Sequence, residues 1–151
     1  MFKKTLSALA VACVMLVSAA AAGTIFPAEY TDIDGVTRAG YLDEDGMTVL
    51  PFAYAQAGDF ADCGLAAVEN EQWQTAVIDR TGKLVIAYTD SPVSVDFSDT
   101  IVAYRYTDHS VYYATDGKHI GSYPGAVGFF EDGLLLCRNC LLYTSDAADE
   151  L

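Results

Sequence analysis

Aromatic residues are the side chains in this sequence best suited to holding a ligand. The chain has ten tyrosines, and four of them cluster at Tyr104, Tyr106, Tyr112 and Tyr113, with Trp73 one predicted unit earlier. Aromatic side chains on an exposed sheet face bind sugars or peptides, because they offer apolar area and, in tyrosine, a hydroxyl. These five residues are the candidate binding surface. The alternative is cross-strand packing in a core, which alternation favours by placing Tyr104 and Tyr106 on one strand face.

Two acidic segments raise the question of calcium binding, because hard cations are bound by several carboxylate oxygens. Residues 32–35 read DIDG and residues 43–46 read DEDG. The residues after Gly46 are Met-Thr-Val-Leu, which supply none of the further ligands that a calcium loop needs. We therefore interpret both segments as turns, which favour Asp and Gly, and we predict no metal site.

The sequence predicts no catalytic residue and no cofactor. His109 and His119 are the only histidines, and no His-Glu-x-x-His or Gly-x-Ser-x-Gly pattern occurs. Both histidines are expected on surface strands or turns. Cys137 and Cys140 have the spacing of a redox motif, but no strand-then-helix pattern surrounds them. A carboxylate pair for glycoside hydrolysis stays open, because sequence does not give spacing in space.

The N-terminus is typical of a secretory signal peptide over residues 1–22. Lys3 and Lys4 precede an apolar run over residues 6–17, and small residues follow it. The run is too short for a transmembrane helix, so no membrane span is expected after cleavage. We predict a secreted or cell-envelope protein. Cys13 leaves open the alternative of a lipid-anchored protein.

Charge and cysteine content narrow the class of partner. The formal charge is −13, and it becomes −15 without Lys3 and Lys4. This charge opposes binding to nucleic acid or to anionic lipid surfaces. Outside the signal peptide and the C-terminal tail, the cysteines are Cys63 and Cys137. An oxidising compartment could join them, and the sequence does not decide whether they pair.

The chain contains an internal repeat. Apolar β-branched runs flank polar turns whose glycines, at steps of 36 and 35 residues, are Gly46, Gly82 and Gly117. A second landmark, a phenylalanine two residues before an aspartate, recurs at Phe60, Phe97 and Phe130. Two landmarks that recur together indicate a repeat architecture.

Each unit predicts a hairpin, a corner and a further strand, with no helix. One three-stranded unit buries too little apolar surface to be stable, so stacked neighbours must cover it. We therefore predict an all-β fold of tandem three-stranded antiparallel repeats of about 35 residues, in an open propeller-like or solenoid array. The expected repeat domain covers residues 23–138. Its units are a partial one over 26–38 and three over 39–74, 75–110 and 111–138.

The repeats resemble the bacterial WG repeat family, whose units begin with Trp-Gly. Residues 39–74 match best, with GYLD at 40–43, PFAY at 51–54 and GLA at 64–66. The resemblance extends over about residues 26 to 137, although Ala39, Thr75 and Ser110 stand at the position of the tryptophan. It implies a β-rich, repeat-built extracellular or envelope module without characterised catalytic residues.

The last residues, 139–151, differ in composition and resemble translated sequencing-adapter sequence. We interpret them as artefactual and the natural protein as longer; the alternative is a short acidic helix that begins at Ser145. The expected function is non-catalytic binding of a protein or a cell-envelope glycan. The alternatives are the targeting arm of an enzyme whose catalytic domain lies beyond the truncation, and a structural spacer at the cell surface.

Overall fold

The computed structural model describes residues 23–131, 134–137 and 143–144, and every regular element in them is a β-strand. The all-β prediction is confirmed. Among these residues no helix is long and apolar enough to span a membrane. The strands are β1 (Ile25–Thr31), β2 (Thr37–Asp43), β3 (Thr48–Tyr54), β4 (Gln56–Ala57), β5 (Leu65–Glu69), β6 (Gln74–Asp79), β7 (Leu84–Asp90), β8 (Ser94–Phe97), β9 (Ile101–Arg105), β10 (His109–Ala114), β11 (His119–Pro124), β12 (Ala126–Glu131), β13 (Leu134–Cys137) and β14 (Tyr143–Thr144).

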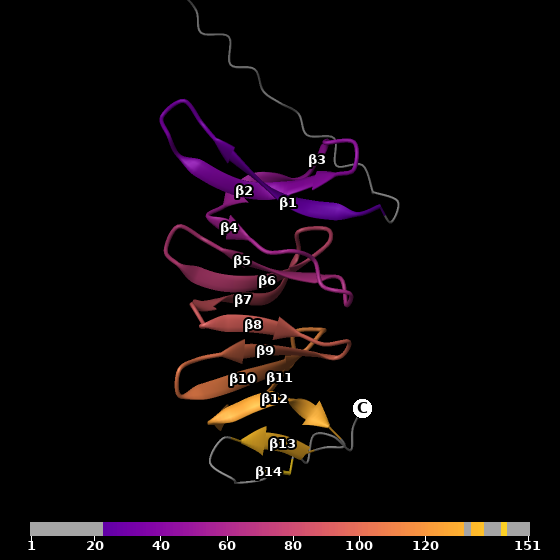
Figure 1. Cartoon of the computed structure of the whole chain (residues 1–151), viewed down its shortest axis with the longest axis vertical. Coiled ribbons are helices and arrows are strands. Elements are labelled where there is room, and N and C mark those ends of the chain that lie inside the picture. Colours follow the sequence, from indigo (N-terminus) through magenta and orange to yellow (C-terminus); the bar gives the residue numbers. More distant parts are fainter. Residues whose placement is uncertain (1–22, 132–133, 138–142, 145–151) are drawn as a thin grey trace, which may run out of the picture.

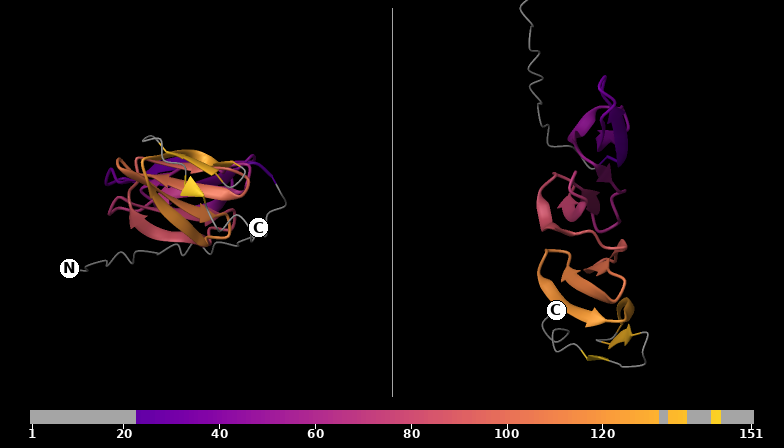
Figure 2. Two further views of the ribbon diagram at one scale, coloured as in Figure 1. Left: turned by 90° about the horizontal axis from the view of Figure 1, so that it is seen from below. Right: turned by 90° about the vertical axis from the view of Figure 1, so that its left-hand side faces the viewer.

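The strands form four open antiparallel sheets that follow one another along the long axis of the molecule (Figures 1 and 2). Sheet A has the order β1-β2-β3, sheet B β4-β5-β6-β7, sheet C β11-β10-β9-β8 and sheet D β12-β13-β14. The prediction of three strands in each repeat is wrong for the units over residues 39–74 and 75–110, which contribute four strands each, β2 to β5 and β6 to β9. The additional strand is the short β4 in the first unit and the short β8 in the second.

The sheets are out of phase with the sequence units. The unit over residues 39–74 supplies β2 and β3 to sheet A, and then β4 and β5 to sheet B. The next unit divides in the same way between sheets B and C. Each sequence unit therefore links two consecutive sheets covalently.

The same hairpin recurs with the same register. Tyr41 pairs with Leu50 in sheet A, Val77 with Ile86 in sheet B and Tyr112 with Gly121 in sheet C. In all three hairpins the register shifts directly after this pair, which marks a β-bulge. The steps of 36 and 35 residues in the sequence are thus preserved in the strand pairing.

The acidic turns are held by their own aspartates. Asp43 Oδ1 accepts hydrogen bonds from the backbone N–H groups of Asp45 (3.1 Å) and Met47 (2.8 Å). Asp32 Oδ1 accepts two such bonds in the β1–β2 turn, from Asp34 and Val36. This local bonding is the usual role of Asp in turns, and it matches our interpretation of both segments.

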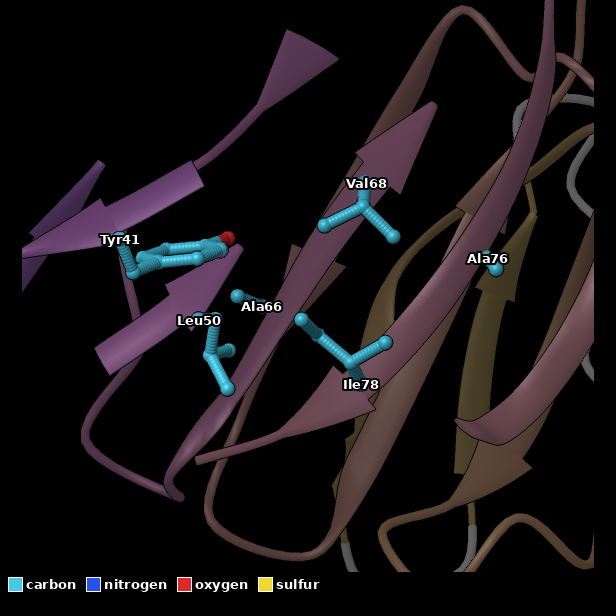
Figure 3. Packing of buried hydrophobic residues seen from close by; sticks show 6 residues of the cluster. All are labelled: Tyr41, Leu50, Ala66, Val68, Ala76 and Ile78. Atoms are coloured by element: carbon cyan, nitrogen blue, oxygen red, sulfur yellow. The ribbon is translucent and has the colours of Figure 1, made fainter. Parts of the chain in front are cut away.

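Both faces of sheets B and C are covered, so the core is a series of layers between sheets. The A–B layer is formed by Tyr41, Leu50, Ala66, Val68, Ala76 and Ile78, which Figure 3 shows. The B–C layer is formed by Leu65, Val77, Ile86, Val102 and Tyr104. The C–D layer is formed by Ile101, Ala103 and Tyr112, with Phe129 packed against them. Alternate residues of one strand thus enter different layers, as the two-residue period requires.

Candidate functional site

The predicted aromatic surface does not exist as one surface. Tyr104 and Tyr112 have no exposed area, so for them the prediction is wrong and the packing alternative is right. Tyr104, Tyr106 and Tyr113 pack in the B–C layer, whereas Tyr112 lies on the opposite face of sheet C. Trp73 is 64% exposed, but it lies in the β5–β6 turn of sheet B.

The partly buried tyrosines are engaged within the chain. The Tyr106 ring stacks on His109 with 4.6 Å between ring centroids, and its hydroxyl donates to the Asp90 carbonyl at 3.1 Å. The Tyr113 ring contacts the rings of Tyr104 and His119. Burial raises the pKa of both Tyr104 and Tyr113 above the ordinary value, and neighbouring tyrosines add to this shift.

In two of the three layers between the described sheets, a tyrosine at the same repeat position bonds across the layer. The Tyr41 hydroxyl of sheet A donates to the Gly58 carbonyl at 2.8 Å, and the Tyr112 hydroxyl of sheet C donates to the Gly128 carbonyl at 2.8 Å. The equivalent residue of sheet B, by strand register, is Val77. The B–C layer therefore lacks a tyrosine at this repeat position, and the tyrosine that bonds across this layer is Tyr106, through the Asp90 carbonyl of sheet B.

Arg105 reinforces the closure of the C–D layer. Its guanidinium donates to Asp96 Oδ2 at 2.8 Å, to the Tyr112 hydroxyl at 2.7 Å, to the Gly128 carbonyl at 2.7 Å and to Ser110 Oγ at 3.2 Å. Burial alone would lower the pKa of Arg105, but the bonds to Asp96 and Tyr112 outweigh it and raise the pKa. The Arg105 side chain is only 14% exposed, whereas Asp96 is 44% exposed, so the guanidinium is shielded from water more than its carboxylate partner.

The B–C layer instead contains a cavity of about 250 Å³, which we call the B–C cavity. Its sheet B wall comes from β4, β5 and β6, and its other wall comes from the β7–β8 link and β8. The lining residues are Gln56, Ala57, Gly58, Ala67, Glu69, Thr75, Pro92, Val93, Ser94 and Val95. The Glu69–Thr75 strand pair of sheet B is equivalent to the Arg105–Ser110 strand pair of sheet C. The B–C cavity therefore lies at the position that Arg105 and its hydrogen-bond partners fill in the C–D layer.

Glu69 is the charged residue of the B–C cavity. Its Oε1 atom accepts hydrogen bonds from Ser91 Oγ at 3.2 Å and from Thr75 Oγ1 at 3.4 Å. The ion pairs of the described residues do not include Glu69. The cavity therefore presents a carboxylate whose orientation is fixed by two hydroxyls and whose charge is not neutralised by a cation. Sequence reasoning missed it, although aligning Val77 with Tyr41 and Tyr112 would have indicated a gap there.

A second hollow, of about 300 Å³, lies between the phenylalanine corners of sheets B and C. It is lined by Phe60, Ala61, Asp62, Cys63, Phe97, Ser98 and Asp99. No group of three or more His, Cys, Asp and Glu side chains that could hold a metal ion occurs in the part of the chain that the structure describes. Cys63 is a free thiol, and sheet C separates it from β13, which contains Cys137.

A substitution at Tyr104 tests whether an unpaired buried hydroxyl destabilises the B–C layer. Its buried hydroxyl has no hydrogen-bond partner among the described residues. Because an unpaired buried hydroxyl is destabilising, we expect Tyr104→Phe to be neutral or to raise the free energy of unfolding by up to about 1 kcal/mol. Tyr41→Phe is the control: it loses the bond to Gly58, so we expect a loss of about 1–2 kcal/mol in urea denaturation. Equal losses for the two variants would contradict an unpaired hydroxyl at Tyr104.

Comparison with known proteins identifies one segment. A family model described as WG containing repeat matches residues 40–72. The match begins in β2 and ends in the turn between β5 and β6, so it crosses from sheet A to sheet B. No curated protein and no solved structure matches the chain. The resemblance inferred from sequence is confirmed for this segment.

Proposed function

We propose that the chain is a non-catalytic binding module, in which WG-type repeats extend through residues 26–137 as an open, solenoid-like array. The signal-like N-terminus supports a place outside the cytoplasm. The partner that fits best is a protein segment. The observation that carries this proposal is the B–C cavity, which lies at the repeat position that Arg105 and Tyr112 fill in the C–D layer.

The size and the lining of the B–C cavity indicate that its ligand is a single side chain rather than a larger molecule. Its volume of about 250 Å³ lies below the range of about 300–1,000 Å³ that pockets for drug-sized ligands occupy. The carboxylate of Glu69 gives the cavity one polar group of fixed orientation. One projecting side chain of a protein matches these dimensions better than an oligosaccharide.

Binding of the full chain to a peptide array and to a glycan array, read side by side, tests this function. We expect saturable binding to a subset of peptides, with no hydrolysis of either class. Saturable binding to glycans alone would show that the partner is a glycan and would contradict a protein partner. Turnover of any substrate would contradict a non-catalytic module.

A structural spacer is the second candidate, and the elongated stack of sheets in Figure 1 favours it. A spacer needs length and stability but no ligand. Absence of saturable binding on both arrays would support the spacer and would contradict the binding module.

A further inference from the structure

We propose that the B–C cavity binds the basic side chain, lysine or arginine, of a partner protein. This inference rests on the proposed binding function and adds the chemistry of the ligand. In the B–C layer Val77 stands at the repeat position of Tyr41 and Tyr112, and Glu69 stands at the repeat position of Arg105.

The charge of the cavity selects a cation. Glu69 occupies the position of Arg105, whose guanidinium in the next layer is neutralised by Asp96 at 2.8 Å. No described cation forms an ion pair with Glu69, and the whole chain has a formal charge of −13. An incoming ammonium or guanidinium group would neutralise the Glu69 carboxylate and donate a charge-assisted hydrogen bond to it.

Two backbone N–H groups of the wall are already committed to other acceptors, which leaves fewer donors for an anion. The Gly58 N–H donates to the Ala67 carbonyl at 2.9 Å, and the Val93 N–H donates to the Arg105 carbonyl at 2.6 Å. Pro92 has no N–H. The Thr75 hydroxyl is 3.4 Å from Glu69 Oε1, within hydrogen-bond distance. The Gln56 amide and the Ser94 hydroxyl of the wall are neutral, so the charged group that a ligand meets is the Glu69 carboxylate, which pairs with a donor such as lysine or arginine.

An NMR titration of the full chain tests the inference with three blocked tripeptides, Gly-Lys-Gly, Gly-Arg-Gly and Gly-(acetyl-lysine)-Gly. We expect the two basic probes to shift the amide signals of Gly58 and Val93. The acetylated probe keeps the aliphatic stem but loses the charge, so we expect binding at least about tenfold weaker.

Two matched variants locate the charge. Glu69→Gln and Glu71→Gln change the net charge equally, but Glu71 lies in the exposed β5–β6 turn, beside Arg38. We expect Glu69→Gln to lower the affinity for the basic probes by about tenfold and Glu71→Gln to change that affinity by less than about twofold. Ala67→Val, which narrows the cavity without a charge change, should weaken them as well.

Each other outcome is decisive. Equal binding of the acetylated and basic probes, equal effects of the two glutamine variants, or no binding of any basic probe would overturn a cation site. If peptides on the array still bind without basic residues, the binding function survives and this inference fails. If no peptide binds at all, the proposed function fails first.

Discussion

Replacing Gly117 by alanine will lower the free energy of unfolding by about 3 kcal/mol or more. Gly117 lies in the β10–β11 turn with φ of +89°, a conformation that disfavours every residue with a Cβ atom. A Cβ atom at this position would also overlap the backbone carbonyl oxygen of Val85 in β7. A backbone carbonyl in a packed layer has little freedom to yield, so sheets B and C would have to separate locally. Urea denaturation measures the loss.

The equivalent glycines of the other two hairpins provide graded controls. Gly46 has φ of +76°, and a Cβ atom added there would meet no atom within 4 Å, so Gly46→Ala should cost only about 1 kcal/mol. Gly82 would meet the flexible end of the Leu50 side chain at 3.1 Å, so Gly82→Ala should fall between the two. Equal losses at the three positions would contradict the close approach of neighbouring sheets.

Replacing Arg105 by leucine will destabilise the chain by about 2–4 kcal/mol, the second largest effect that we expect. The substitution removes four hydrogen bonds and leaves the Tyr112 hydroxyl and the Gly128 carbonyl with fewer partners in a partly buried network. Asp96 is 44% exposed, so water can solvate its carboxylate, and this limits the loss. Thermal or urea unfolding measures it.

Two further variants separate charge from geometry. Arg105→Lys keeps the positive charge beside Asp96 but loses the planar fork, so we expect it to recover less than half of the loss. Arg38→Leu removes an arginine whose ion pairs, at 3.8 and 3.6 Å, are exposed, and it should cost at most about 0.5 kcal/mol. A fully stable Arg105→Lys variant would show that charge alone, without the hydrogen-bond fork, maintains the C–D layer.

The repeat was predictable because its turns are specified locally. Gly46, Gly82 and Gly117 need positive φ, and Asp43 and Asp79 cap their own turns, so residue type and conformation agree at each site. β4 was not predictable, because Gln56 and Ala57 are too few to show alternation. Its pairing with Glu69 and Val68 is imposed by the sheet rather than by its own sequence.

The candidate site was harder to predict, because alternation assigns a strand face but not what covers it. Tyr104 and Tyr106 share a face as expected, yet that face is covered by sheet B. The run from Ile101 to Tyr104 is continuously apolar, which is typical of a strand buried on both sides and was the available signal. The B–C cavity depends on differences between repeats, so only a comparison of Val77 with Tyr41 and Tyr112 could have indicated it.

The links between consecutive sheets have a consequence for how the chain acquires its structure. Ala55 alone separates β3 from β4, Gly125 alone separates β11 from β12, and three residues separate β7 from β8. Every layer is therefore made by segments that are neighbours in the chain, which keeps the relative contact order low. Such a polypeptide can acquire structure progressively from its N-terminal end, each completed sheet serving as the template for the next, without waiting for distant segments to meet.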